Sequence, residues 1–139
     1  MHMRQLKDAK LKLTLALPNG AANVTSSPAI DLGVTTALGQ PASREEAILT
    51  APAMTTAQMP DAKTMKYDLI TADSADLATN PVTLVTAAIT QTGAGGAGCA
   101  AATYNFVPPS TSKRYFGFKA TGSASGDATG AAATLEMVF

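Results

Sequence analysis

The sequence predicts an all-β protein, a jelly-roll-like β-sandwich of about eight strands. Apolar and polar residues alternate along several short segments, most clearly where leucine occupies positions 11, 13, 15 and 17. Glycine and proline separate these segments at short intervals, which is typical of turns. No long segment has the periodicity of an amphipathic helix. The length of 139 residues favours one domain spanning residues 1–139.

The predicted core depends on a small number of large side chains. The hydrophobic fraction is 46%, but alanine supplies much of it, aromatic residues make up only 5%, and tryptophan is absent. Alanine buries little surface, and burial stabilises a fold by about 25 cal/mol per Å². We therefore expect most of the core to come from Leu11, Leu13, Leu15, Leu69, Ile70, Val85, Phe106, Tyr115, Phe116, Phe118, Leu135 and Phe139.

Two strands are predicted near the N-terminus. Residues 1–10 are expected to form a flexible or partner-bound arm that precedes them. Alternation from Leu11 to Leu17 predicts the first strand, and the turn signal Pro18-Asn19-Gly20 ends it. A polar stretch from Asn23 to Pro28 then leads into Ile30-Asp31-Leu32-Gly33, which predicts a short strand closed by glycine.

The segment after Gly33 could form either a short helical turn or a loop that leads into a strand. Residues 34–42 predict a loop. Ser43 followed by Glu46 fits a helical capping box, but a loop leading into a strand through Ile48 and Leu49 is the favoured interpretation.

Three further strands and their turns are predicted in the middle of the chain. Alternation from Met65 to Leu69 predicts one strand, and the Val-, Thr- and Ile-rich run from Val82 to Thr90 predicts the next. The segment from Cys99 to Val107 predicts a third, which Pro108-Pro109 ends.

The last two strands lie between residues 113 and 139 and are joined by a Gly/Ser-rich loop. Phe116 and Phe118 share one face of the first, because side chains alternate along a strand. Leu135, Met137 and the final residue share one face of the second, which is expected to run to that residue. We expect both phenylalanines on the inner face of a central strand, with Leu135 and Met137 as neighbours.

The charge balance excludes some classes of partner. Ten basic and ten acidic residues cancel, and charged residues make up 14% of the chain, against about 25% in a typical soluble domain. We expect no nucleic-acid partner, because a basic excess is missing, and no membrane partner, because no long apolar run or signal peptide is found. Two interpretations fit this composition equally: a protein packed against others, or a soluble β domain covered by Thr and Ser.

One glycine-rich motif could indicate a nucleotide site. Residues Gly93 to Gly98 match the pattern G-x-G-x-x-G after a predicted strand. A dinucleotide site also needs a helix that begins at those glycines. The strand from Cys99 to Val107 leaves no room for that helix, so a flexible hairpin loop is favoured. We expect this loop to tolerate replacement of Gly95 and Gly96, unless either has a positive φ.

The remaining candidate residues have simpler structural explanations. Asp68, Asp73 and Asp76 lack the other oxygen donors of a calcium loop and are interpreted as turn residues. One histidine, His2, and one cysteine, Cys99, cannot form a zinc site, a catalytic couple or an internal disulfide. Arg114 beside Tyr115 could anchor a carboxylate or stack, but a charged residue at a strand start is the ordinary interpretation. We expect no catalytic, cofactor-binding or metal-binding residues and no enzyme activity.

The order of the segments from residue 28 to residue 139 carries a resemblance to a known family. The matching pieces are Ile30-Asp31-Leu32-Gly33, Met65 to Ile70 with Thr71-Ala72-Asp73-Ser74, Pro109, Lys113 to Phe118, Gly122 and the final strand. In these pieces the chain resembles the capsid cement (decoration) proteins of tailed bacteriophages, of the type found on the Bordetella short-tailed phage. The resemblance implies a dimeric jelly-roll sandwich outside the coat-protein shell that ties neighbouring capsomers together.

The function expected from the resemblance is that of a viral structural protein. Its expected partners are the phage major capsid protein and a second copy of itself, and its expected location is the capsid exterior, after synthesis in the bacterial cytoplasm. Capsid-binding residues are not identified by any short motif. The alternatives are another virion β-sandwich, such as a tail or head-completion protein, or a carbohydrate-binding module. The absence of tryptophan disfavours the carbohydrate-binding alternative, because such modules use exposed aromatic platforms.

Overall fold

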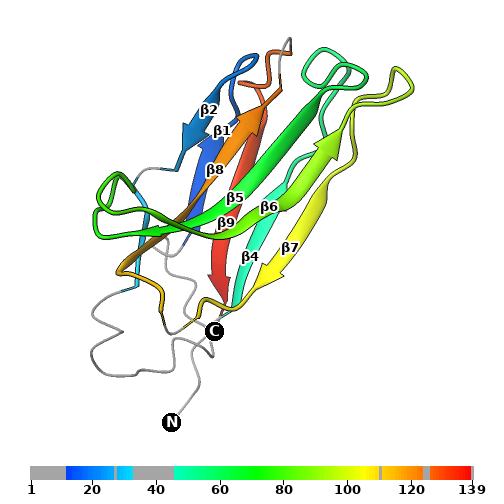
Figure 1. Ribbon diagram of the computed structural model, residues 1–139. Coiled ribbons are helices and arrows are strands. Elements are labelled where there is room, and N and C mark those ends of the chain that lie inside the picture. The colour runs from blue at the N-terminus through cyan, green and yellow to red at the C-terminus, as the bar shows by residue number, and fades with distance from the viewer. Residues whose placement is uncertain (1–11, 27, 33–45, 110, 124–125, 139) are drawn as a thin grey trace.

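The computed structural model describes residues 12–26, 28–32, 46–109, 111–123 and 126–138. It confirms the all-β class, because these residues form nine strands in two antiparallel sheets and contain no helix (Figure 1). The two sheets enclose one main hydrophobic core, as in a β-sandwich. The additional strand lies in the polar stretch that begins at Asn23, where the sequence predicted none. The jelly-roll topology stays a prediction.

The first sheet combines strands from both ends and the middle of the chain. Its order is β1-β9-β4-β7, so that β9 and β4 are central and β1 and β7 form the edges. All three strand pairs keep a continuous register. The strands are β1 (Lys12–Ala16), β9 (Ala132–Val138), β4 (Glu46–Ala51) and β7 (Ala102–Phe106).

The second sheet is built around β8 and β5. Strands β2 and β3 lie along one edge of β8, and β5 lies between β8 and β6. The strands are β2 (Asn23–Thr25), β3 (Ile30–Asp31), β8 (Tyr115–Gly122), β5 (Thr64–Ala72) and β6 (Val82–Thr92). The β5–β6 pairing shifts register between Tyr67 and Ile70, and Ala87 in the shifted part of β6 has a φ of 53°. Extra residues in β6 therefore make it a bulged edge strand.

The prediction for the two phenylalanines of β8 is confirmed. Phe116 and Phe118 are fully buried, and β8 is a central strand of its sheet. Leu135 and Met137 of the opposite sheet are buried in the same core cluster. The alternation of side chains along each strand thus directs both sets of residues into the space between the sheets.

Several expected core residues differ in the structure. Leu15, Val85 and Phe106 are only partly buried against the main core, because β1, β6 and β7 are edge strands. Tyr115 packs instead in a second, smaller cluster. Leu11 and Phe139 lie outside the described residues. The core also contains small and flexible side chains that were not predicted: Ala47, Ala51, Met54, Met59, Met65, Ala120, Ala128, Ala131 and Ala133.

A buried polar network joins the two sheets. The Tyr67 hydroxyl on β5 donates a hydrogen bond to Oε1 of Gln91 on β6, at 2.8 Å. The Gln91 side-chain amide donates in turn to the backbone oxygens of Pro52, just after β4, and Ala100, just before β7, at 2.8 and 2.9 Å. Each buried polar atom of this network has a partner, as a stable core requires.

The strand expected through Ile48 and Leu49 is confirmed as β4. The loop over residues 34–42, Ser43 of the alternative capping box and the N-terminal arm over residues 1–10 lie outside the described residues.

Candidate functional site

The glycine loop from Gly93 to Gly98 leads from one sheet to the other and not into a helix. It connects β6 with β7, which belong to different sheets, so the expected hairpin is wrong although the loop is confirmed. The backbone N–H of Gly96 donates to both carboxylate oxygens of Asp61, at 2.9 and 3.2 Å. A phosphate group at this N–H would meet a carboxylate of the protein's own chain. Both observations oppose a nucleotide site here.

The same loop depends on its glycines. Gly95, Gly96 and Gly98 have φ angles of 63°, 66° and 69°. These angles belong to the left-handed region, in which other residues are strained. The condition for tolerance of changes at Gly95 and Gly96 is therefore not met, and we no longer expect these replacements to be neutral.

The three aspartates considered as cation ligands each bond to groups of the protein. Asp73 accepts a hydrogen bond from the Asn80 side chain at 3.0 Å and forms an ion pair with Lys113 at 3.4 Å. These contacts, with Asn80 first, hold the Asp73 pKa below its usual range. No group of three His, Cys, Asp or Glu side chains that could hold a metal occurs within the described parts of the chain.

The other two aspartates differ in role. Asp76 accepts from the Ser74 hydroxyl and from the backbone N–H of Ala78, which lowers its pKa and confirms a turn residue. Asp68 lies on β5 instead, where it accepts a hydrogen bond from the bulged Ala87 N–H at 2.8 Å. The turn prediction is therefore wrong for Asp68.

Arg114 binds a carboxylate, but one of its own chain. Its Nε and Nη2 atoms donate to the two carboxylate oxygens of Asp31, each at 2.9 Å. Its guanidinium carbon lies 5.2 Å from the centre of the Tyr115 ring. The bonds to Asp31 raise the Arg114 pKa above its ordinary value. The pair therefore fastens β3 to the start of β8.

The surroundings of the single cysteine favour a structural role over a reactive one. Cys99 is partly buried and pairs with Met54 through two backbone hydrogen bonds of 3.0 Å. Burial raises the pKa of its thiol, which opposes formation of the reactive thiolate at neutral pH. His2 lies outside the described residues.

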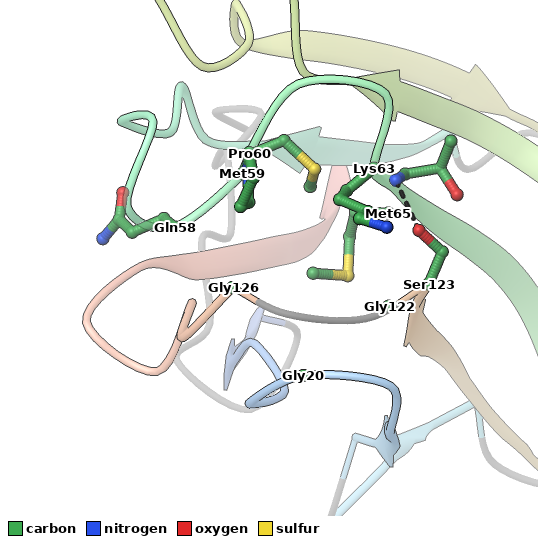
Figure 2. Close-up of a pocket in the computed structure, with 10 residues that line it drawn as sticks. Gly20, Gln58, Met59, Pro60, Lys63, Met65, Gly122, Ser123 and Gly126 are labelled. Atoms are coloured by element: carbon green, nitrogen blue, oxygen red, sulfur yellow. Dashed lines mark hydrogen bonds between the residues drawn. The ribbon is translucent and has the colours of Figure 1, made fainter. Parts of the chain in front are cut away.

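The loops at one end of the sandwich enclose a small hollow (Figure 2). Its volume of about 10 Å³ is room for a single water molecule. A second hollow, of about 140 Å³, lies over β5 and β8 and is lined by Thr64, Lys66, Thr121, Gly122 and Ser123. Both are smaller than the roughly 300–1,000 Å³ of typical ligand pockets. Neither favours a small-molecule substrate.

Glycines let these loops pack against one another. A Cβ atom on Gly122 would lie 2.6 Å from the backbone oxygen of Gly20, and one on Gly126 would lie 2.3 Å from that of Gln58. Gly20 also donates a backbone hydrogen bond to Gly126 at 2.7 Å. Figure 2 shows these glycines around Met59 and Met65, whose side chains are buried below the loops. This end of the molecule is therefore closely packed.

The outer face of the first sheet presents side chains from all four of its strands. One row across it consists of threonines from all four strands: Thr14 lies opposite Thr134, Thr134 opposite Thr50, and Thr50 opposite Thr103. The neighbouring row consists of Lys12, Glu136, Ile48 and Asn105. We call this surface the threonine face; it comprises Lys12, Thr14, Ala16, Glu46, Ile48, Thr50, Thr103, Asn105, Ala132, Thr134, Glu136 and Val138.

The threonine face carries charges of both signs outside the threonine row and none within that row. Lys12, Glu46 and Glu136 are its charged members, and Glu46 accepts a hydrogen bond from the Asn105 side chain at 3.2 Å. The threonine row could not be found from the sequence, because it depends on the strand register. Its chemistry suits adhesion to another protein surface, since short hydroxyl side chains can form hydrogen bonds and lose little conformational entropy.

In the described residues, no helix is long and apolar enough to cross a membrane. A scan against protein-family models finds no matching family, and no curated protein has a significantly similar sequence.

Proposed function

We propose that this protein is a capsid cement (decoration) protein of a tailed bacteriophage. It binds the outside of the coat-protein shell and stabilises the contacts between capsomers. The observation that carries the proposal is the combination of a threonine row across all four strands of the first sheet with two hollows in the described residues that are too small for a substrate. The segment order from residue 28 to residue 139, which resembles cement proteins, gives the proposal its specific partner.

The proposed mechanism is adhesion without chemistry. A protein that binds only the assembled shell stabilises it by RT ln(1 + [L]/Kd) at each site. Copies that each bridge several coat subunits increase the total affinity through multivalency. The ten basic and ten acidic residues create no strong net charge, so we expect binding to the shell to depend only weakly on salt.

The proposed partners are the major capsid protein and a second copy of this chain. The protein would be made in the bacterial cytoplasm and would reside on the capsid exterior, as a jelly-roll dimer. Neither nucleic acid nor membrane is a proposed partner, and the process needs no cofactor.

A carbohydrate-binding role receives less support from the aromatic residues. Tyr67 is fully buried, and Tyr104 and Tyr115 are partly buried in contact with neighbouring side chains. None of the three tyrosines forms the exposed platform on which sugar rings stack.

The test is an add-back experiment with the phage that encodes this chain. Shells stripped of the protein should release DNA at lower temperature and lose resistance to osmotic shock, and addition of purified protein should restore both. Electron microscopy and copy number per virion show where it binds. Binding only at the tail vertex, at low copy number, would replace the cement function with that of a tail or head-completion protein, and no binding would refute both.

A further inference from the structure

The edge strands of the two sheets differ in how well they are protected against pairing with another chain. Proteins protect an edge with very short strands, bulges, prolines or charged side chains, especially lysine. Strands β2 and β3 are three and two residues long, β6 is bulged, and β1 contains Lys12. Strand β7 has none of these features.

The edge of β7 that faces away from β4 is regular and uncharged. All five of its residues, Ala102 to Phe106, pair in continuous register with β4, and within the described residues no strand pairs with its other side. Its two outward side chains, Thr103 and Asn105, are exposed. Its inward rings, Tyr104 and Phe106, stack at 6.5 Å and are only partly buried. Among the described residues, a strand edge without a pairing strand thus coincides with partly exposed aromatic side chains.

The side chains of β7 match those of a second β7 strand that runs in the opposite direction. If two copies pair antiparallel with Tyr104 at the centre, Thr103 lies opposite Asn105 and Ala102 lies opposite Phe106. A hydroxyl then meets an amide on the outer face, and a small side chain meets a large one on the inner face. The two central tyrosines form an aromatic pair, which is favourable across strands. No like charges meet, since β7 contains no charged residue.

We propose that two copies of this protein associate through β7, antiparallel about a two-fold axis at Tyr104. The two four-stranded sheets then join into one continuous sheet, and the threonine faces of both copies lie on the same side of it. This inference deepens the proposed function by assigning the face of the proposed dimer. The dimer forms without a capsid, however, so it can be tested on the isolated protein.

The test compares charge variants by sedimentation velocity over a concentration series. The parent protein should sediment as a dimer. The double variant Thr103→Lys/Asn105→Lys places lysines opposite each other twice in the proposed register, and it should sediment as a monomer at the same concentrations. The matched control Thr14→Lys/Ala16→Lys changes exposed residues at the other edge of the same face and should remain a dimer.

Charge complementation separates the interface from damage to the fold. Thr103→Glu/Asn105→Glu should also be a monomer alone, and an equimolar mixture of the lysine and glutamate variants should form a heterodimer. If the lysine variant fails to fold, Tyr104→Cys in a Cys99→Ser background gives a second readout, because the two-fold pairing brings the introduced thiols together. That variant should form a disulfide-linked dimer under mild oxidation.

Three outcomes would overturn the proposal. They are a parent protein that is monomeric at every concentration, a dimer that persists in the lysine variant, and a thiol variant that does not cross-link. Failure of capsid binding alone would leave the β7 dimer unaffected.

Discussion

Phe106 of β7 and Phe116 of β8 stack across the two sheets, with their ring centres 6.0 Å apart and their planes inclined by 19°. Phe116 is fully buried at a central position of its sheet, whereas Phe106 belongs to an edge strand and is only partly covered. This contact joins the buried core to the edge strand β7. Because Phe116 is fully buried, a substitution there tests the core directly.

Phe116→Ala should lower the free energy of unfolding by about 3–5 kcal/mol, because a large cavity remains between the sheets. Urea denaturation followed by circular dichroism measures the change. Val107→Ala is the control, since Val107 is 49% exposed and its truncation should change stability by about 0.5 kcal/mol or less. Equal midpoints for Phe116→Ala and the parent would contradict the assignment of Phe116 to the core.

Gln91→Ala should destabilise the protein more than Tyr67→Phe does. Loss of the Gln91 amide leaves the Tyr67 hydroxyl and two backbone oxygens without their partner, at a cost of about 1–3 kcal/mol for each unsatisfied group that stays dry. Tyr67→Phe removes one donor and leaves one acceptor unpaired. The control is Gln58→Ala, whose side chain accepts a single exposed hydrogen bond from Thr55. The reverse order of the two core variants would show that Gln91 does not join the sheets.

Gly98→Ala should lower the melting temperature more than Gly95→Ala does. Both glycines have positive φ, which costs other residues about 1–2 kcal/mol. A Cβ atom on Gly98 would also lie 1.9 Å from the backbone oxygen of Met54, whereas no atom lies within 4 Å of one on Gly95. Gly130→Ala, at which φ is not positive and the nearest contact is 3.5 Å, should change stability by about 0.5 kcal/mol or less. Melting temperatures of the three variants give the order.

Tyr67 should make the fold sensitive to alkaline pH. Burial disfavours its phenolate form and, with a smaller contribution from Cys99, raises the Tyr67 pKa well above its ordinary value. In the unfolded chain a tyrosine ionises near about pH 10, while folded Tyr67 keeps its proton. Stability from this group is therefore complete below that pH and decreases as the pH rises above it.

Tyr67→Phe removes this titration, so its free energy of unfolding should decrease less between neutral and strongly alkaline pH than that of the parent. Urea titrations at a series of pH values measure the two slopes. Parallel slopes for the variant and the parent would exclude Tyr67 as the responsible group.

Local patterns predicted eight of the nine strands, through alternation in some segments and through β-favouring residues or bordering turn residues in others. They missed β2, which has three residues and contains one apolar side chain, Val24. The alanines and methionines of the core were not predicted either. They fill the space beside large side chains such as Phe116 and Tyr67, and the size of that space depends on how closely the two sheets approach. The threonine row and the bidentate contact between Arg114 and Asp31 join residues far apart in the sequence. Strand pairing brings the residues of both features together, so no local sequence pattern could predict either feature.

The central position of β9 in the first sheet has a consequence for how the molecule is made. Strand β1 finds its only described partner in β9, and β4 needs β9 along one side. The ribosome therefore makes β1, β4 and β7 before the strand that joins β1 to the other two. The first sheet can close only after β9 has been made, and non-local pairing of this kind makes folding slow, on a scale of about milliseconds to seconds.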